Sequence, residues 1–167
     1  PLEQNAAKKG MTLEAYKESL DLLDAAEVST VLENLNAYER IQEENAASYY
    51  LTEKLPFGAN YVDYDLNVTH DWDNQGSHGS HVSGIAAANS FLYTDEGFVS
   101  ALDSAMVQGV APDAQLIAMK VFGKAGGAYV SDYMAAIEDA IVLGCDSCNL
   151  SLGSGNPGTS RNATAEY

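Results

Sequence analysis

The sequence predicts an α/β fold in which a parallel sheet is flanked by helices. Residues 115–121 form a nearly continuous apolar run, which is typical of a strand buried on both faces of a parallel sheet. The following segment has a capping serine, apolar residues at helical spacing and a terminal glycine: Ser131, Met134, Ile137, Ile141 and Gly144. Residues 146–152 then indicate another strand. This alternation of strand and helix is typical of α/β proteins.

Residues 1–55 are predicted to form amphipathic surface helices. Thr12 can cap one helix, and Asp24 and Glu27 have the spacing of a capping box before a second. Apolar residues follow both caps at helical spacing: Leu13, Tyr16, Leu20 and Leu23, then Val28, Val31, Leu32, Leu35 and Tyr38. Such stripes usually make core contacts, and this part of the sequence indicates no chemistry.

The middle of the chain is predicted to contain a strand, a polar loop and a helix. Residues 55–62 indicate the strand, and residues 63–75 the loop, which carries several aspartates. These carboxylates lack the central glycine and terminal glutamate of an EF-hand, so a solvated loop is the better interpretation. Residues 109–113 contain Pro112 and Asp113 and indicate a turn, which follows an insertion from about residue 90 to 108.

Charge and hydropathy exclude some classes of function. The 167 residues include 24 acidic and 8 basic side chains, and the formal net charge is −16. Nucleic-acid binding requires Lys and Arg against the phosphates, so we expect no nucleic-acid partner. No run of 18 apolar residues is present, and we expect no membrane-spanning segment.

The strongest candidate for chemistry is residues 76–85, where His78 and His81 lie among glycines and serines. Histidine is the side chain whose ordinary pKa lies nearest neutral pH, so it is suited to general base catalysis. Apolar residues follow, so we expect the pair to begin a buried helix. Metal ligands and a hydrogen-bonded core histidine are the alternatives, and the downstream sequence favours a catalytic base.

Both cysteines lie in one short segment. Cys145 and Cys148 form a C-x-x-C pattern, but we expect this segment to be a strand that follows a helix. Positions three apart in a strand face opposite sides of the sheet, so a redox or metal role is not favoured.

Four blocks carry a resemblance to a known family. They are H-G-S-H-V-S-G from His78, G-V-A-P-D from Gly109, the glycine-rich residues 123–128 with their helix, and N-L-S-L-G from Asn149. Their order and spacing over residues 57–155 resemble the subtilisin-like serine proteases. The helical insert upstream and the lead-in P-F-G-A-N-Y from Pro56 most resemble the large cell-envelope subtilases of Gram-positive bacteria, of the lactocepin and C5a-peptidase type.

The resemblance implies a subtilisin-like three-layer fold and an Asp-His-Ser triad in which His78 is the general base. His81 would be the structural histidine of the pair. Gly126 and Gly127 would form one substrate-binding strand, and Ser151, Leu152 and Gly153 the other. An extended polypeptide would lie between these strands by β-augmentation, which requires small residues on both sides.

Two parts of the family pattern are missing from the sequence. No aspartate lies in a V-x-D-[ST]-G context, and no G-T-S-M-A block is present. Ser160 follows Gly158 and Thr159, but Arg161 comes next, so Ser160 is a poor candidate for the nucleophile. We therefore expect residues 1–55 to be a helical insert and residues 56–167 the central part of a longer catalytic domain, inactive by itself. The alternative function is a degenerate subtilase-like module that binds peptides without cutting them.

The resemblance also predicts where the protein is located and which cofactors it needs. The acidic charge and the family resemblance together indicate an extracellular or cell-envelope protein of a Gram-positive bacterium. The chemistry requires no cofactor and the sequence assigns no catalytic metal. Structural calcium commonly accompanies the family, but the insertion after the histidine helix differs in length, so no calcium ligands are assigned.

Overall fold

The computed structural model describes residues 2–71, 73–74, 76–89, 91–94, 97–100 and 108–153. Ser160 lies outside them. The chain divides into two compact units, which are described separately. The first contains Pro1–Leu23 and Ser77–Leu116, and the second contains Asp24–Gly76 and Ile117–Tyr167. Throughout the described ranges, every helix is too short or too polar to cross a lipid bilayer.

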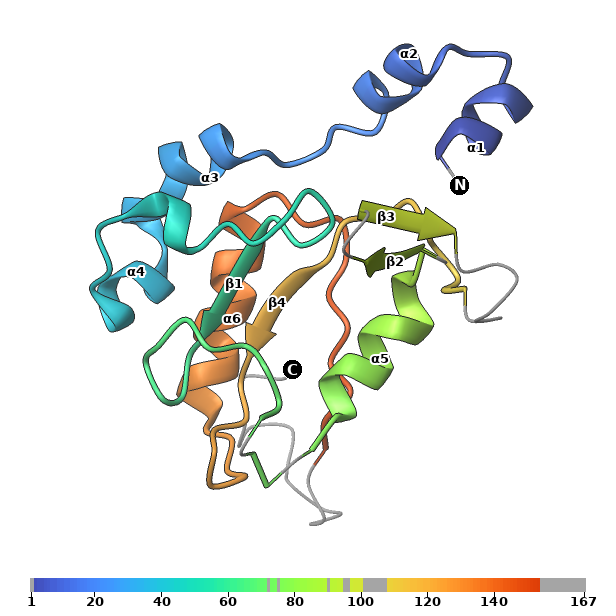
Figure 1. Ribbon diagram of the computed structural model, residues 1–167. Helices are drawn as coiled ribbons and strands as arrows, with labels where there is room; N and C mark the ends of the chain where they lie inside the picture. The colour runs from blue at the N-terminus through green and yellow to red at the C-terminus, as the bar shows by residue number, and fades with distance from the viewer. Residues whose placement is uncertain are drawn as a thin grey trace, which may run out of the picture. The chain divides into compact units, whose positions relative to one another are not determined.

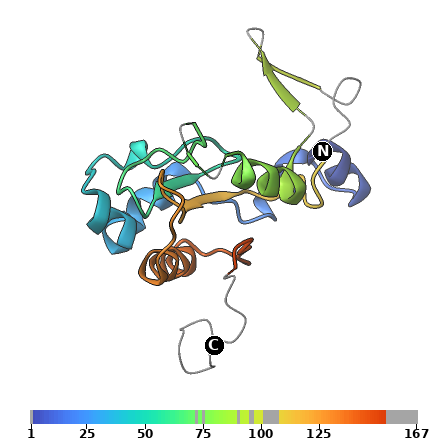
Figure 2. The same ribbon diagram turned by 90° about the horizontal axis from the view of Figure 1, so that it is seen from below.

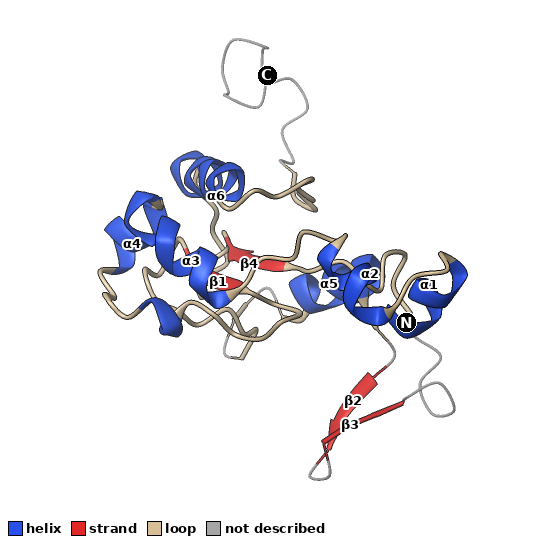
Figure 3. Cartoon of the chain, turned by 90° about the horizontal axis from the view of Figure 1, so that it is seen from above, coloured by secondary structure: helices blue, strands red, loops and turns tan. Residues whose placement is uncertain are grey.

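The described residues of the first unit form three helices and a hairpin (Figures 1 and 3). The helices are α1 (Leu2–Lys8), α2 (Leu13–Glu18) and α5 (His78–Ala87), and the hairpin joins antiparallel strands β2 (Phe91–Thr94) and β3 (Gly97–Ser100). Thr12 caps α2 by accepting a hydrogen bond from the Ala15 amide, as its position predicts. The sequence did not indicate the hairpin within its insertion.

The N-terminal segment of this unit is tied to the residues after the G-V-A-P block. Asn5 donates a hydrogen bond to the Asp113 carboxylate, and the Leu23 amide donates one of 2.8 Å to Oε1 of Gln115. Nε2 of Gln115 donates in return to the Leu23 carbonyl at 2.9 Å. These bonds fix both ends of the segment to residues about 100 positions away in the sequence.

The second unit is built on a parallel strand pair, β1 (Phe57–Asn60) and β4 (Ile117–Lys120). Phe57 pairs with Ile117 and Asn60 with Lys120. α6 (Val130–Val142) lies along one face of the pair (Figure 2). The pair confirms the predicted parallel sheet, although both strands are shorter than their apolar runs and β4 is half-buried, whereas we expected it buried on both faces.

The remaining elements of this unit are α3 (Ala25–Val31), η1 (Leu32–Asn34), α4 (Asn36–Ile41) and η2 (Ala46–Ser48). The predicted capping box is present, because Asp24 accepts from the Glu27 amide and Glu27 accepts from the Asp24 amide. Their buried residues form one core with β1: Val28, Leu32, Leu35, Ala37, Tyr49, Phe57 and Tyr61. Within it the rings of Tyr49 and Phe57 stack with centroids 5.7 Å apart. The assignment of residues 1–55 as an insert stays a prediction.

The buried face of α6 differs from the predicted stripe. Ile141 is 72% exposed, while Tyr133, Ala136 and Asp139 are buried. Two carboxylates, Asp132 and Asp139, lie on this buried face because each has partners from the helical segment before β1. Periodicity of apolar residues cannot reveal such a face. Ser131 does not cap the helix, which begins at Val130, but Gly144 follows it with φ of +75° as predicted.

Candidate active site

His78 is the first residue of α5. The helix begins after Ser77, whose carbonyl accepts a hydrogen bond of 2.9 Å from the His81 amide. His78 and His81 are both exposed, and Ala87 is the buried residue of this helix. The predicted helix start is therefore confirmed, but the expectation of a buried helix is wrong, and neither histidine occupies a core position. The structural role expected for His81 stays a prediction. Gly79, Ser80, Ser83 and Gly84 carry too little side chain to bury the first two turns.

The G-V-A-P block completes the other end of α5. The amides of Gly109, Val110 and Ala111 donate to the carbonyls of Ala88, Ile85 and Ala86 at 2.8, 3.0 and 2.9 Å. The last carbonyls of a helix have no partners within the helix, and these bonds supply them. A Cβ atom at residue 109 would lie 2.4 Å from the Ala88 nitrogen, so only glycine permits this approach.

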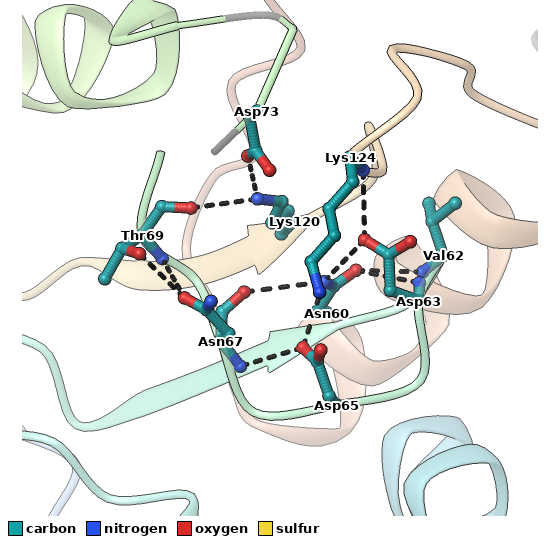
Figure 4. A network of polar contacts seen from close by, with 9 residues as sticks. All are labelled: Asn60, Val62, Asp63, Asp65, Asn67, Thr69, Asp73, Lys120 and Lys124. Carbon is teal, nitrogen blue, oxygen red and sulfur yellow. Dashed lines mark hydrogen bonds and ion pairs between the residues drawn. The ribbon is translucent and has the colours of Figure 1, made fainter. Parts of the chain in front are cut away.

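Residues 61–76, which we call the β1–α5 loop, carry the chain to His78 and are organised around Asn60 (Figure 4). Asn60 is 1% exposed. Its side-chain amide donates to the carboxylates of Asp63 and Asp65 at 3.1 and 3.0 Å. Its Oδ1 accepts from the amides of Val62 and Asp63 at 3.2 and 3.1 Å. Its side-chain amide also donates to the Asn67 carbonyl at 3.4 Å. One buried side chain thus binds five groups of the loop, so the solvated loop expected from its aspartates is ordered at its start.

Electrostatics favour the ionised form of Asp63. The hydrogen bond from Asn60, opposed by slight desolvation and supported by the Lys124 amide, lowers the pKa of this carboxyl. The Lys124 amide donates to Oδ2 of Asp63 at 3.1 Å. Asp63 therefore stays an acceptor for both groups at neutral pH.

The end of the β1–α5 loop is tied to β4. Nζ of Lys120 donates to the Thr69 carbonyl at 2.9 Å and forms an ion pair with the Asp73 carboxylate. The Lys120 and Asp73 side chains are only 12% and 6% exposed. The Asn74 amide donates to the Lys124 carbonyl at 3.2 Å. These bonds therefore hold Thr69, Asp73 and Asn74 against β4 and the residues that follow it, within the second unit.

Residues 121–129, the β4–α6 loop, include the predicted substrate-binding residues Gly126 and Gly127. Gly126 has φ of +82°, and its amide donates to the Gly123 carbonyl at 2.8 Å, which makes a tight turn. A Cβ at Gly123 would lie 2.7 Å from Cγ1 of Val62, so glycine allows this loop to pack against the β1–α5 loop. A Cβ at Gly127 would meet nothing within 4 Å. Gly127 is thus exposed at the carboxyl end of a parallel strand, where α/β proteins bind ligands.

The second predicted substrate segment, Ser151–Gly153, is a loop. Ser151 and Gly153 are exposed, and Nδ2 of Asn149 donates to Oγ of Ser151 at 2.9 Å. Among the described residues neither sheet includes residues 146–152, so the strand predicted there is wrong. This segment and Gly126–Gly127 belong to the second unit, whereas His78 belongs to the first, and each is placed within its own unit.

The cysteines lie in the loop that follows α6 and are free thiols. Cys145 is partly buried and Cys148 is exposed. Burial, together with Cys148 and Asp146 nearby, raises the pKa of the Cys145 thiol. Because the segment is a loop, strand geometry does not place the two side chains on opposite faces. The reason given from the sequence against a redox role therefore does not apply.

The described residues contain no cluster of His, Cys, Asp or Glu side chains that marks a metal site. In the part of the chain that the structure describes, no group of three or more such side chains could hold an ion. Asp63 and Asp65 lie close together, but the Asn60 amide lies between them as a donor. The structural calcium implied by the family resemblance therefore has no assigned place here.

Sequence reasoning missed the residues that hold these loops, including Asn60, Lys120 and Asp73. One signal was present, since an asparagine that ends an apolar strand and precedes two aspartates is typical of a turn organised by its own side chain. Lys120 gave no such signal. Its partner Asp73 is 47 residues away in the sequence, and only the parallel pairing brings the two together.

Comparison with known proteins assigns the family. Residues 43–167 match the model of the subtilase family, Peptidase S8. The chain belongs to the subtilase family. This match includes His78, both predicted substrate segments and the loops described above, and it confirms the α/β fold class as a partial subtilisin-like fold. No solved structure matches this subtilase chain.

Curated relatives are proteinases of Gram-positive bacteria. The PII-type proteinase of Lacticaseibacillus paracasei is 41% identical over 108 residues, which cover 63% of this chain and 5% of the relative. The minor extracellular protease Vpr of Bacillus subtilis is 37% identical over 94 residues, 54% of this chain and 10% of the relative. The C5a peptidase of Streptococcus pyogenes is 32% identical over 118 residues, 69% of this chain and 9% of the relative. The chain spans a tenth or less of the length of these subtilase relatives.

Proposed function

We propose that the complete gene product containing this chain is a serine endopeptidase that hydrolyses polypeptides with an Asp-His-Ser triad. The observation that carries this proposal is His78, exposed at the first position of α5 within the H-G-S-H-V-S-G block of a subtilase sequence. In this position its imidazole is open to solvent and to a reacting serine hydroxyl. His78 would take the serine proton and return it to the leaving amine.

The polypeptide substrate would bind in extended form between Gly126–Gly127 and Ser151–Gly153. Support comes from the accessibility of both segments, since Gly127, Ser151 and Gly153 are exposed. A substrate strand needs free space above the backbone, and Gly127 has no atom within 4 Å of its Cβ position. The sequence contains neither the V-x-D-[ST]-G nor the G-T-S-M-A block, so residues 1–167 alone would show no peptidase activity above background.

The named relatives also support a location. One is described as extracellular, and the matched organisms are Gram-positive bacteria. Acidic net charge agrees with a solvent-exposed protein. The complete protein would therefore act outside the cell or in the cell envelope, on polypeptides.

A reagent that acylates or phosphonylates active-site serines tests the proposal. The complete gene product should be labelled at one serine and should lose its ability to cut an unfolded protein substrate. The His78→Ala variant should label far more slowly. A protein that binds peptides but is neither labelled nor proteolytic would overturn the proposal and would indicate a degenerate peptide-binding module.

A further inference from the structure

Arg40, in the last turn of α4, contacts two segments that are far apart in the sequence. Its Nη1 donates to the Tyr61 carbonyl at 3.1 Å and to Oδ1 of Asp132 at 2.8 Å. Its Nη2 donates to the Ser131 carbonyl at 3.0 Å, and its guanidinium carbon lies 5.6 Å from the centre of the Tyr64 ring. One planar group therefore has four partners.

These partners lie at the ends of the two candidate site loops. Tyr61 and Tyr64 are at the start of the β1–α5 loop, which leads to His78. Ser131 and Asp132 lie in the first turn of α6, directly after the β4–α6 loop that contains Gly126 and Gly127. Arg40 thus joins the segment before the candidate base to the segment after the candidate substrate strand.

The Arg40 contacts are partly buried and geometrically specific. The Arg40 and Asp132 side chains are 22% and 6% exposed. A guanidinium can serve two carbonyls and a carboxylate at once because its N–H groups are fixed in one plane, whereas a lysine ammonium is a point charge on a flexible stem. Replacing both members of a buried ion pair with apolar residues often costs little stability, which favours a role in geometry for the intact pair. Removing one member alone leaves a buried charge unpaired and is destabilising.

We propose that Arg40 is a positioning residue of the peptidase, which holds the β1–α5 and β4–α6 loops in the arrangement that peptide hydrolysis requires. The inference rests on the proposed function of this site. It assigns to the helical segment before β1 a role that the segment's own sequence did not indicate.

The test compares Arg40→Met and Arg40→Lys in the complete gene product. With an extended peptide substrate, Arg40→Met should lower kcat/KM by about 10- to 100-fold, because small misplacements in an active site cost that much. Much of the loss should appear in KM, since the substrate strand follows β4. A single-residue ester, which does not occupy that strand, should lose less than about threefold. The kcat/KM of Arg40→Lys on the extended peptide should lie between those of wild type and Arg40→Met, because a lysine reaches fewer acceptors.

Asn36→Ala is the matched control. Asn36 also anchors α4 to α6, through Asp139 and the Ala135 carbonyl, but it touches neither loop. It should lower thermal stability as Arg40→Met does while changing kcat/KM on the extended peptide by less than about threefold.

Equal losses of kcat/KM in Asn36→Ala and Arg40→Met would overturn the inference, as would an Arg40 variant that loses stability but keeps wild-type kcat/KM and KM. If Arg40→Met does not fold, Arg40→Lys decides by the same comparison. A wild-type protein that neither cuts peptides nor reacts with a serine reagent would contradict the proposed function itself. Failure of the proposed function can therefore be distinguished from failure of the inference about Arg40.

Discussion

The hydroxyl group of Tyr61 donates a hydrogen bond of 2.8 Å to the carboxylate of Asp139, and both side chains are completely buried. Burial, reinforced by the Asp139 charge, raises the pKa of Tyr61 well above its ordinary value, so the phenol remains a donor. The same carboxylate accepts from the amides of Asn36 and Ala37 at 2.7 and 2.8 Å. Asp139 therefore joins the start of α4 and the residue directly after β1 to the last turn of α6.

Removing this carboxylate should loosen α4. Asp139→Ala leaves buried donors on Tyr61, Asn36 and Ala37 without an acceptor, which should lower the free energy of local opening by about 3 kcal/mol. Amide hydrogen exchange in residues 36–41 of the complete gene product should accelerate by about 100-fold. Glu138→Gln is an exposed change on the same helix that keeps an oxygen able to accept the 3.1 Å hydrogen bond from Nδ2 of Asn36, and it should alter this exchange by less than about 0.5 kcal/mol. Wild-type exchange in Asp139→Ala would contradict the role of this contact.

A methyl group at position 109 should disrupt the end of the histidine helix. The Cβ of Gly109→Ala would lie 2.4 Å from the Ala88 nitrogen and 2.5 Å from the Ala87 nitrogen, and backbone atoms cannot move aside cheaply. We expect a loss of about 2 kcal/mol in the opening free energy of α5, measured by hydrogen exchange of residues 82–88. Gly84→Ala in the same helix has no atom within 4 Å of its Cβ and should instead stabilise α5 by about 0.5–1 kcal/mol. If both variants behave alike, the close approach at Gly109 does not exist.

Order in the β1–α5 loop should depend on pH through Asp63. The folded pKa of this carboxyl is lowered, so its ionised form stabilises the fold at pH above the unfolded value, and that contribution is lost as pH falls through the folded value. Hydrogen exchange in residues 61–68 should therefore rise below about pH 4 after correction for intrinsic rates. Asp63→Asn should exchange faster than wild type at pH 7, and the difference should shrink as the pH falls.

Asp71→Asn changes an exposed aspartate of the same loop and serves as the control. It should leave the pH dependence of residues 61–68 in place. A difference between wild type and Asp63→Asn that grows toward low pH would give the opposite sign and contradict the assignment.

The two thiols should differ in reactivity. Burial first, and then the neighbouring Cys148 and Asp146, raise the pKa of Cys145, while Cys148 is exposed. Because the thiolate is the reactive form, iodoacetamide should label Cys148 faster at pH 7.5, by on the order of tenfold. Labelling of Cys145 should continue to accelerate as the pH is raised further. Mass spectrometry of the peptides measures both rates, and faster labelling of Cys145 at pH 7.5 would contradict the structure.

Local sequence signals predicted much of the fold. Thr12 and Asp24 cap helices as expected, and residues 57–60 and 117–120 are strands of the expected parallel sheet, although their pairing with each other was not predicted. The helix that begins at His78 was predicted from the apolar residues that follow the histidine pair. These features depend on neighbouring residues or on a short motif, which is why one sequence was sufficient.

The missed features depend on residues distant in sequence. The helix expected across Leu35 is broken there, because Asp139 binds the Asn36 and Ala37 amides and starts a new helix. The buried face of α6 carries Asp132 and Asp139, which a hydrophobic stripe does not predict. Residues 146–152 are apolar enough for a strand, but among the described residues no sheet includes them. Ion pairs such as that of Arg40 with Asp132 cannot be predicted from one sequence, because only the fold brings the two residues together.

The most direct test of the central claim is kcat/KM of the His78→Ala variant of the complete gene product on an unfolded protein substrate. His70→Asn, which changes an exposed histidine of the β1–α5 loop, is measured beside it. If His78 is the general base, His78→Ala should lower kcat/KM by about 10⁴-fold or more, while His70→Asn stays within about threefold of wild type. Proteolysis by His78→Ala within about tenfold of wild type would contradict the assignment of His78 as the catalytic base of this subtilase.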